Sequence, residues 1–199
     1  TGWLPEKVLD ELVNGHPVLY RVTVPQGLSW WQTGKVLEEA GLVVFEDFRK
    51  VVTDPDFLRH YGIPFATAEG FLMPDTYLLK KNEVMDIAQA KAVAGRMVDN
   101  FWRKTAPVWP DGKKPGQGQT DQFKTWVILA SIVEKETGQA SDRAQVAGVF
   151  TNRLRKGILL QTDPTVIYGL GENFDGRLRK VHLQTDTPWN TYTRPGLPP

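Results

Sequence analysis

The spacing of apolar residues along the chain changes from a helical to an alternating pattern and back. Residues 5–13 place apolar side chains three and four positions apart, which predicts a short helix ending before Gly15. Residues 19–24 follow a period of two and predict a strand. Ser29 is the expected N-cap of a helix that ends before Gly41. The N-terminal segment therefore predicts a small α+β module.

Helical spacing resumes after this module. Residues 45–62 are expected to be helical, with a break at Asp54 before a proline, and residues 84–104 are expected to form one long helix. Residues 105–120 are rich in proline, glycine and polar side chains, which is typical of an exposed loop. This loop separates the N-terminal part of the chain from a different C-terminal part.

From residue 121 onward a helix carries a broad apolar arc, which indicates that it is buried. The arc consists of Phe123, Trp126, Val127, Leu129, Ala130 and Val133. A second helix is expected over residues 141–155, whereas residues 186–199 show neither a helical nor a strand period. The C-terminal part is therefore expected to be mainly helical.

Composition changes this picture by excluding several classes of partner. The 199 residues are 41% hydrophobic and 24% charged, enough for one large domain or two small ones. The formal charge of +1 shows no excess of basic residues of the kind that binds nucleic acid. A neutral polymer or a small molecule is therefore a better candidate for the ligand. The chain lacks cysteine, and His16, His60 and His182 lack the spacing of metal ligands. We therefore expect no metal site and no nucleic-acid partner.

Two carboxylates stand at the end of the apolar helix, in "ASIVEKETG". Glu134 and Glu136 point about 160° apart on a helix, so at most one faces a given cleft. Glu136 lies in the final turn, where the helix dipole and partial burial favour a carboxyl that keeps its proton, as a general acid requires. The alternative is a solvated or ion-paired helix end. Spacing alone does not decide between the two.

Further candidates follow in "LLQTDPTVIYGLG". Gln161 and Thr162 are expected to be extended and to aim an amide and a hydroxyl into a cleft. Asp163 precedes Pro164 and is a natural N-cap, which favours a structural role for its carboxylate. Tyr168 either stacks on a ligand or packs in the core. These residues are hypotheses for a binding site.

Aromatic and amide groups recur near the end of the chain. Trp189, Asn190 and Tyr192 combine flat apolar faces with polar atoms, which suits sugar rings, although loop aromatics more often serve packing. The sequence has no nucleophile elbow, no phosphate-binding loop and no dinucleotide motif, so no cofactor is expected. Glycosidic chemistry by a carboxyl acid is the main class left, and a non-catalytic glycan-binding module is its rival.

Four separated motifs resemble the endolytic murein transglycosylase family, also called YceG-like. In order, they are "EGFLMPDTYLL", "LASIVEKETG", "VAGVFTNRLRKGILLQTDPTVIYGLG" and "WNTYTRPGLPP". In the family the catalytic acid is a glutamate followed by threonine, which implies Glu136, with Glu134 as second choice. The resemblance also implies substrate-binding roles for Glu69, Asp75 and the polar and aromatic candidates above. Trp189 stands where the family usually has tyrosine, which keeps a stacking face and removes a hydroxyl.

The resemblance implies an α+β fold in three parts. These are a LysM-like peptidoglycan-binding module over residues 1–62, a connecting region over 63–120, and a mainly helical lytic-transglycosylase-type catalytic domain over 121–199. Relatives continue beyond both ends of this chain, so a preceding membrane helix and a further C-terminal segment are also implied. The expected location is the cytoplasmic membrane, with these domains on its outer side.

The implied reaction cleaves the bond from N-acetylmuramic acid to N-acetylglucosamine inside peptidoglycan strands. Glu136 would protonate the leaving oxygen and then help to deprotonate the muramic acid 6-hydroxyl, giving a 1,6-anhydro end. The implied partners are glycan strands and penicillin-binding cell-wall synthases. A muramidase-type hydrolase is the enzymatic alternative, because Asp163 could act as a second carboxylate.

Overall fold

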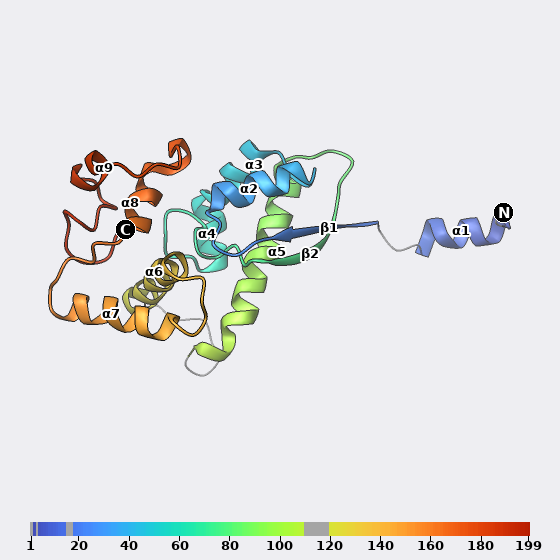
Figure 1. Ribbon diagram of the computed structural model, residues 1–199. Coiled ribbons are helices and arrows are strands. Elements are labelled where there is room, and N and C mark those ends of the chain that lie inside the picture. The colour runs from blue at the N-terminus through green and yellow to red at the C-terminus, as the bar shows by residue number, and fades with distance from the viewer. Residues whose placement is uncertain (1, 3, 15–17, 110–119) are drawn as a thin grey trace.

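A computed structural model describes residues 2, 4–14, 18–109 and 120–199, with only the backbone described at Glu11 and Leu12. Helix α1 (Pro5–Asn14) lies apart from the body of the molecule (Figure 1). An N-terminal unit follows it, and a C-terminal helical unit lies at the opposite end (Figure 1). The expected end of the first helix at Gly15 and residues 110–119 of the expected loop fall outside the described residues.

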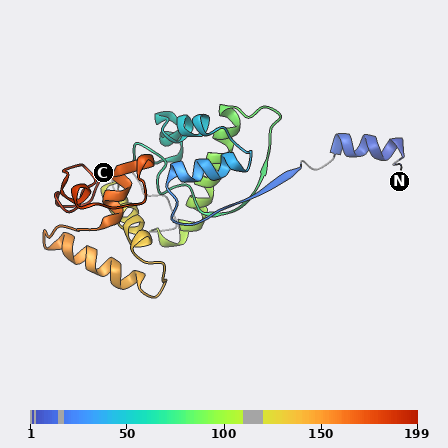
Figure 2. The ribbon, with the colours of Figure 1, turned by 45° about the horizontal axis from the view of Figure 1, so that its top comes forward.

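The N-terminal unit packs helices against a small sheet. Its elements are β1 (Leu19–Val24), α2 (Trp30–Glu39), α3 (Phe45–Val52), α4 (Pro55–Tyr61), β2 (Asp75–Lys80) and α5 (Ile87–Thr105). The two strands are antiparallel, with Val22 opposite Tyr77. Val22, Val24, Tyr77 and Leu79 are buried, as expected for alternate residues on the covered face of a sheet. Figure 2 shows the helices of this unit gathered at one end of the two-stranded sheet.

Side-chain caps fix where these helices begin. Ser29 forms a capping box with Gln32 at the start of α2, and Asp54 accepts hydrogen bonds from two backbone N–H groups of α4. Asp86 caps α5, so this helix begins at Ile87 and not at residue 84 as predicted. The expected strand, the capped helix after Ser29 and the break at Asp54 are confirmed. Strand β2 was not predicted.

The C-terminal unit consists of short helices and connecting segments. It contains α6 (Thr120–Glu136), α7 (Arg143–Arg155), α8 (Asp163–Leu170) and α9 (Lys180–Gln184). A 3-10 turn follows α5 at Ala106–Val108, and another follows α8 at Gly171–Asn173. The helices predicted over residues 121 onward and 141–155 are confirmed. The fold is thus α+β and mostly helical, with one two-stranded sheet among the described residues.

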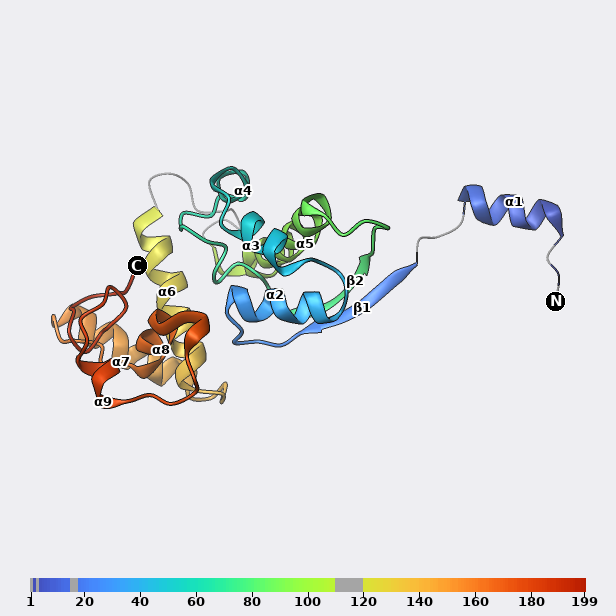
Figure 3. The same ribbon diagram turned by 90° about the horizontal axis from the view of Figure 1, so that it is seen from above.

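Helix α6 takes part in two separate hydrophobic cores. Its N-terminal half inserts Phe123 into the core of the first unit, with Val127 packed at the edge. Its C-terminal half contributes Ile132 and Val133 to a smaller core that includes Phe150. Figure 3 shows α6, in yellow, between the two groups of elements. The predicted arc is therefore only partly buried, since Trp126 is 38% exposed.

No helix in the described ranges is long and apolar enough to cross a membrane. The domain boundaries at residues 62 and 120 remain predictions.

The packing of Phe123 generates a stability prediction. Its ring is 3% exposed and lies against Phe71, Trp102 and Trp109. Phe123→Ala should lower the free energy of unfolding by about 3 to 5 kcal/mol, because it removes a large buried ring and leaves a cavity. Chemical denaturation followed by tryptophan fluorescence measures this. Gln122→Ala, on the exposed side of the same helix, is the control and should change stability by less than about 0.5 kcal/mol. Equal stability of both variants would contradict this packing.

Candidate active site

The two glutamates at the end of α6 have different partners. The Thr162 hydroxyl donates a hydrogen bond to Oε1 of Glu136. Glu134 instead forms an ion pair with Arg143, with 3.4 Å between Oε2 and Nη2. Glu136 is exposed, so the partial burial expected for it is not found. The structure thus assigns Glu134 an ion pair with α7 and leaves Glu136 accessible beside the segment that precedes α8.

Two threonines, Thr165 and Thr191, hold Thr162 in place. The Thr162 N–H donates to Thr191 Oγ1 at 3.1 Å, and the hydroxyls of Thr165 and Thr191 lie 2.9 Å apart. Thr165 Oγ1 donates to the Thr162 carbonyl oxygen at 2.9 Å. All three side chains are at least 96% buried. Thr162 therefore contacts Glu136 from inside the protein, and its expected contact with a sugar stays a prediction.

Gln161 has a left-handed backbone conformation next to this network. Its φ is +50°, the one positive φ of a non-glycine residue in the described chain, and its N–H donates to the Thr191 carbonyl at 3.0 Å. Such a conformation costs about 1 kcal/mol or more for a residue with a Cβ and is found preferentially at functional sites. The side chain is exposed, so Gln161 remains available to a ligand.

Asp163 does not cap its own helix, which corrects the expectation from the sequence. Helix α8 begins at Asp163, so the N-cap residue is Thr162, and its side chain makes no capping bond. The Asp163 carboxylate instead accepts a hydrogen bond of 2.6 Å from the Tyr192 hydroxyl. The local signal for a cap was overridden by a tertiary partner 29 residues away.

Tyr192 links the two carboxyl groups of the site. Burial and then the hydrogen bond to Asp163 raise the pKa of Tyr192 to about 12, and the charge of Glu136 adds to the shift. The phenol therefore keeps its proton at neutral pH and acts as a hydrogen-bond donor. Glu136, Asp163 and Tyr192 thus form one electrostatically connected group at the start of α8.

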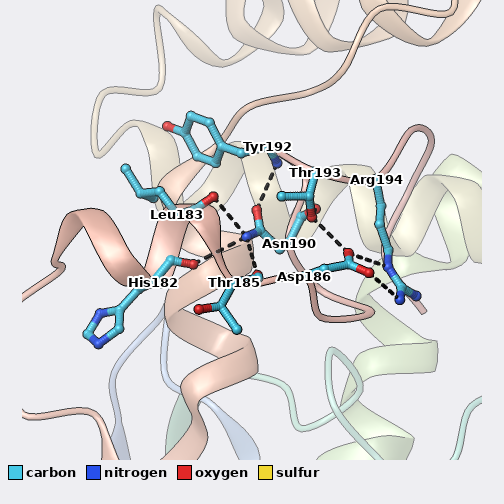
Figure 4. A network of polar contacts seen from close by, with 8 residues as sticks. All are labelled: His182, Leu183, Thr185, Asp186, Asn190, Tyr192, Thr193 and Arg194. Carbon is cyan, nitrogen blue, oxygen red and sulfur yellow. Dashed lines mark hydrogen bonds and ion pairs between the residues drawn. The ribbon is translucent and has the colours of Figure 1, made fainter.

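Asn190 does not face a ligand. It is fully buried, and its Nδ2 lies 2.7 to 3.2 Å from the carbonyl oxygens of His182, Leu183 and Thr185 (Figure 4). Its Oδ1 accepts the N–H of Tyr192 at 2.9 Å. The side chain has no exposed surface in this structure, and its expected contact with sugar stays a prediction. Asn190 closes the end of α9 and positions Tyr192.

An ion pair stiffens the same loop at its surface. Asp186 receives two hydrogen bonds from the Arg194 guanidinium, at 2.7 and 2.9 Å, and one from the Thr193 hydroxyl (Figure 4). These bonds, Arg194 first, hold the pKa of Asp186 down at about 2. The loop that carries Tyr192 is thus held by the buried Asn190 and by the ion pair of Asp186 with Arg194.

Three other candidates lie in different surroundings. Trp189 is half-buried against Gly169, where an added Cβ would come within 2.8 Å of the Trp189 Cβ. Tyr168 packs on Trp31, with 5.1 Å between the ring centroids, and burial, followed by the nearby charge of Glu69, raises the pKa of its hydroxyl. Tyr168 and Glu69 therefore join the two units, away from the start of α8.

Asp75 contacts α5 and not the Glu136 group. Its carboxylate accepts hydrogen bonds from Asn100 Nδ2 and Lys104 Nζ, each at 2.9 Å. Lys104 first, and then Asn100, hold its pKa down at about 2. These contacts tie β2 to α5 and give Asp75 a structural role.

Sequence reasoning missed Thr165 and Thr191, which hold Thr162. Neither carries a signal beyond its place one turn after Thr162 or next to Asn190.

Within the described residues, no three Asp, Glu or His side chains gather as metal ligands. The site is therefore an accessible carboxylate held by a buried hydroxyl, next to a second carboxylate that accepts from a phenol. Such an arrangement suits general acid–base chemistry.

Comparison with known proteins gives the class of the chain. The model of the YceG-like family matches residues 1–199, and the chain belongs to this family. It is 48% identical over 154 residues to the endolytic murein transglycosylase of Bacillus subtilis (strain 168), a match covering 77% of this chain and 39% of that protein. It is 26% identical over 225 residues to the protein of the same name from Streptococcus pneumoniae serotype 2 (strain D39 / NCTC 7466), covering 98% and 39%. The chain thus spans less than half the length of these relatives.

A solved structure shares the fold. The crystal structure of a protein described as yceG-like, from Listeria monocytogenes, matches with a TM-score of 0.71 and 27% identity. The match covers 97% of this chain and 65% of that one. This structure thus shares the fold of the chain over nearly its whole length.

The burial of Asn190 generates a second prediction. Asn190→Ala should lower the free energy of unfolding by about 3 kcal/mol, because it strands buried carbonyl oxygens at the end of α9. Urea denaturation measures the change. Asn152→Ala is the matched control, since Asn152 is exposed and its side chain accepts only from Arg155. An Asn190→Ala variant as stable as the control would show that the carboxamide does not hold this loop.

Proposed function

We propose that this chain carries the active site of an endolytic lytic transglycosylase that cleaves peptidoglycan between N-acetylmuramic acid and N-acetylglucosamine. The observation that carries the proposal is the accessible Glu136 carboxylate, held by Thr162 and in electrostatic contact with Tyr192. The names of the relatives support the same activity. Glu136 is the proposed general acid and base.

The hydrogen bond from Thr162 distinguishes the two oxygens of Glu136. Oε1 accepts the Thr162 hydroxyl, so Oε2 is the oxygen that carries the proton toward the substrate. In the first step this proton passes to the glycosidic oxygen as its bond to the anomeric carbon breaks. In the second step the Glu136 carboxylate takes the proton of the muramic acid 6-hydroxyl as that oxygen bonds to the anomeric carbon. The glutamic acid is regenerated, and no water is consumed.

This scheme needs one essential carboxylate, because the nucleophile is part of the substrate. A tethered hydroxyl gains the advantage of an intramolecular reaction. Tyr192 and Gln161 are the groups proposed to orient the sugar. The half-buried face of Trp189 is a further proposed contact for a sugar ring.

A muramidase is the second candidate, and the position of Asp163 favours it. Retaining and inverting glycosidases use two carboxyl groups, and Asp163 shares Tyr192 with Glu136 and is not occupied by capping. In the transglycosylase proposal Asp163 instead holds the Tyr192 hydroxyl in a fixed direction. The two proposals differ in the chemical end of the product.

We further propose that residues 1–62, whose strand β1 pairs with β2, form a LysM-like module that binds glycan. Two antiparallel strands separated by helices support this proposal. The proposed setting is the outer side of the cytoplasmic membrane, through an anchor in the full-length protein, beside cell-wall synthases. Resemblance to the family is the support for this setting.

The role of Glu136 predicts the effect of removing its proton. Glu136→Gln in the full-length protein should keep the fold and glycan binding while lowering the rate of glycan cleavage by about 10²- to 10⁴-fold, because an amide cannot donate the proton. Release of soluble fragments from purified peptidoglycan measures the rate. Glu134→Gln is the matched control and should lose less than about tenfold, since Glu134 is paired with Arg143. Equal loss in both variants would refute the assignment. A wild-type protein that binds glycan and releases nothing would be a binding module.

The absence of a water nucleophile predicts the product. Fragments should end in 1,6-anhydromuramic acid, one water lighter than hydrolysis products and without a reducible end. Mass spectrometry before and after borohydride reduction distinguishes the two. Asp163→Asn should leave the anhydro ends unchanged, with a slower rate through the altered hydrogen bond to Tyr192. Reducing ends that disappear in Asp163→Asn would instead establish the muramidase.

A further inference from the structure

Arg153 reaches from the end of α7 to the segment that leads into the candidate site. It lies in the last turn of α7, and its Nη1 donates a hydrogen bond to the Leu160 carbonyl oxygen at 2.5 Å. The Leu159 carbonyl oxygen lies 3.5 Å from the same nitrogen. A hydrogen bond from a charged donor is about twice as strong as one between neutral groups. Arg153 therefore holds the chain at the residue before Gln161.

The backbone of Arg153 is fixed at the same place. The N–H of Ile158 donates to the Arg153 carbonyl at 2.9 Å, and the N–H of Gly157 donates to the Leu154 carbonyl at 3.1 Å. Gly157 has a φ of +66°. These two bonds and the left-handed glycine form a Schellman motif, which ends the helix. Arg153 thus holds the chain after α7 twice, through its carbonyl oxygen and through its guanidinium.

The peptide bond between Leu160 and Gln161 is held at both of its polar atoms. Its oxygen accepts from Arg153, and its N–H donates to the Thr191 carbonyl at 3.0 Å. A peptide unit is planar, so two bonds on opposite edges fix its orientation. The left-handed φ of +50° at Gln161 is the rotation directly after this plane. Relaxing this strained conformation by a flip of the peptide unit would break both hydrogen bonds.

The next peptide unit leads to Glu136. The N–H of Thr162 donates to Thr191 Oγ1 at 3.1 Å, and the Thr162 hydroxyl donates to Oε1 of Glu136. Because χ1 of threonine is restricted, the direction of this hydroxyl follows from the backbone at Thr162. That backbone follows directly after the peptide plane that Arg153 holds. The chain from Leu160 to Thr162 therefore connects Arg153 to the Glu136 carboxylate.

We propose that Arg153 is a positioning residue for the reaction. By holding the Leu160 carbonyl it keeps Gln161 in its left-handed conformation. That conformation aims the Thr162 hydroxyl at Glu136. This inference rests on the proposed function for its kinetic tests, and a test by hydrogen exchange is independent of activity.

The first kinetic test uses Arg153→Ala in the full-length protein. Loss of the guanidinium should lower kcat on uncrosslinked glycan strands on the order of tenfold, because a small displacement of catalytic groups is costly, while KM stays within about twofold. Arg155→Ala is the matched control and should leave kcat unchanged, since Arg155 lies in the same turn of α7 and donates to Asn152 Oδ1 at 3.1 Å. An unchanged kcat in Arg153→Ala would overturn the proposal. A raised KM with kcat intact would do the same, because Arg153 would then bind glycan directly.

A double variant separates positioning from a general loss of stability. Thr162→Val removes the hydroxyl that contacts Glu136, keeps the shape of the side chain, and should lower kcat at least as much as Arg153→Ala. In the Thr162→Val background, Arg153→Ala should lower kcat by less than about twofold further, because the contact that it supports is already lost. Full activity of Thr162→Val, or a second full loss in the double variant, would contradict the proposed route.

Hydrogen exchange of the full-length protein, resolved to single amides by mass spectrometry, supplies the readout that needs no catalysis. Arg153→Ala should speed exchange at Gln161 and Thr162 by about tenfold or more, because these N–H groups lose a fixed peptide plane. Ile158 should keep its protection, since its partner is the Arg153 backbone, which the variant retains. Equal acceleration at Ile158 would indicate fraying of α7 and would overturn the proposal, as would unchanged exchange at Gln161.

Two further outcomes are distinguishable. If Arg153→Ala does not fold, Arg153→Lys carries the exchange test, and its shorter side chain with a single donor group should speed exchange at the same two amides by at least about twofold. If the wild-type protein released no fragments, the proposed function would fail, and the exchange rates would still decide whether Arg153 holds the turn at Gln161.

Discussion

The sharing of α6 between two hydrophobic cores is the constraint on which the arrangement of this molecule depends. Phe123 fixes one end of the helix in the N-terminal unit, and Val133 fixes the other end in the C-terminal unit. At 1.5 Å per residue, the distance along the axis from Phe123 to Glu136 is about 20 Å. A rigid helix of this length transmits the orientation of the larger core to the carboxylate at its end. The smaller core alone has four buried apolar residues, too few to fix that orientation by itself.

The described contacts hold Glu136 from two directions. Helix α6 carries the residue, and Thr162, at the start of α8, holds one of its oxygens. Both helices contact the N-terminal unit, α6 through Lys135 and α8 through Tyr168. The relative position of the two helices is therefore set by the small core between them and by a common external support.

Elements with strong local signals were predictable from the sequence. The starts of helices at Ser29 and Asp54 depend on a side chain and on N–H groups two or three residues away. Strand β2 depends on a partner strand more than fifty residues earlier, and its sequence, DTYLLK, has three consecutive apolar residues and no alternation. Its pairing is thus a tertiary property that no short window records.

The sequence brought Glu136 into the candidate site, its role as the acid stays a prediction, and the residues that surround it were less predictable. Glu136 was assigned through a motif, and the structure places it beside Thr162 of another motif. Asn190 has the chemistry of a sugar ligand, but its burial depends on how the loop folds around α9. Asp163 has the local pattern of a cap, yet its partner is Tyr192. In both cases the sequence specified the functional group, and long-range packing decided what it contacts.

The threonines show why the support is more specific than its composition suggests. The Thr191 hydroxyl accepts a hydrogen bond from the Thr162 N–H. It still carries its own proton, with which it can donate a hydrogen bond to Thr165 Oγ1. Thr165 in turn uses its proton on the Thr162 carbonyl. With these three bonds assigned, each donor has one acceptor, and the Thr162 hydroxyl is left with Glu136 as its partner. The β-branched side chain restricts rotation about χ1 and keeps that hydroxyl in the same direction. These buried threonines therefore determine which oxygen of an exposed carboxylate accepts the Thr162 hydroxyl.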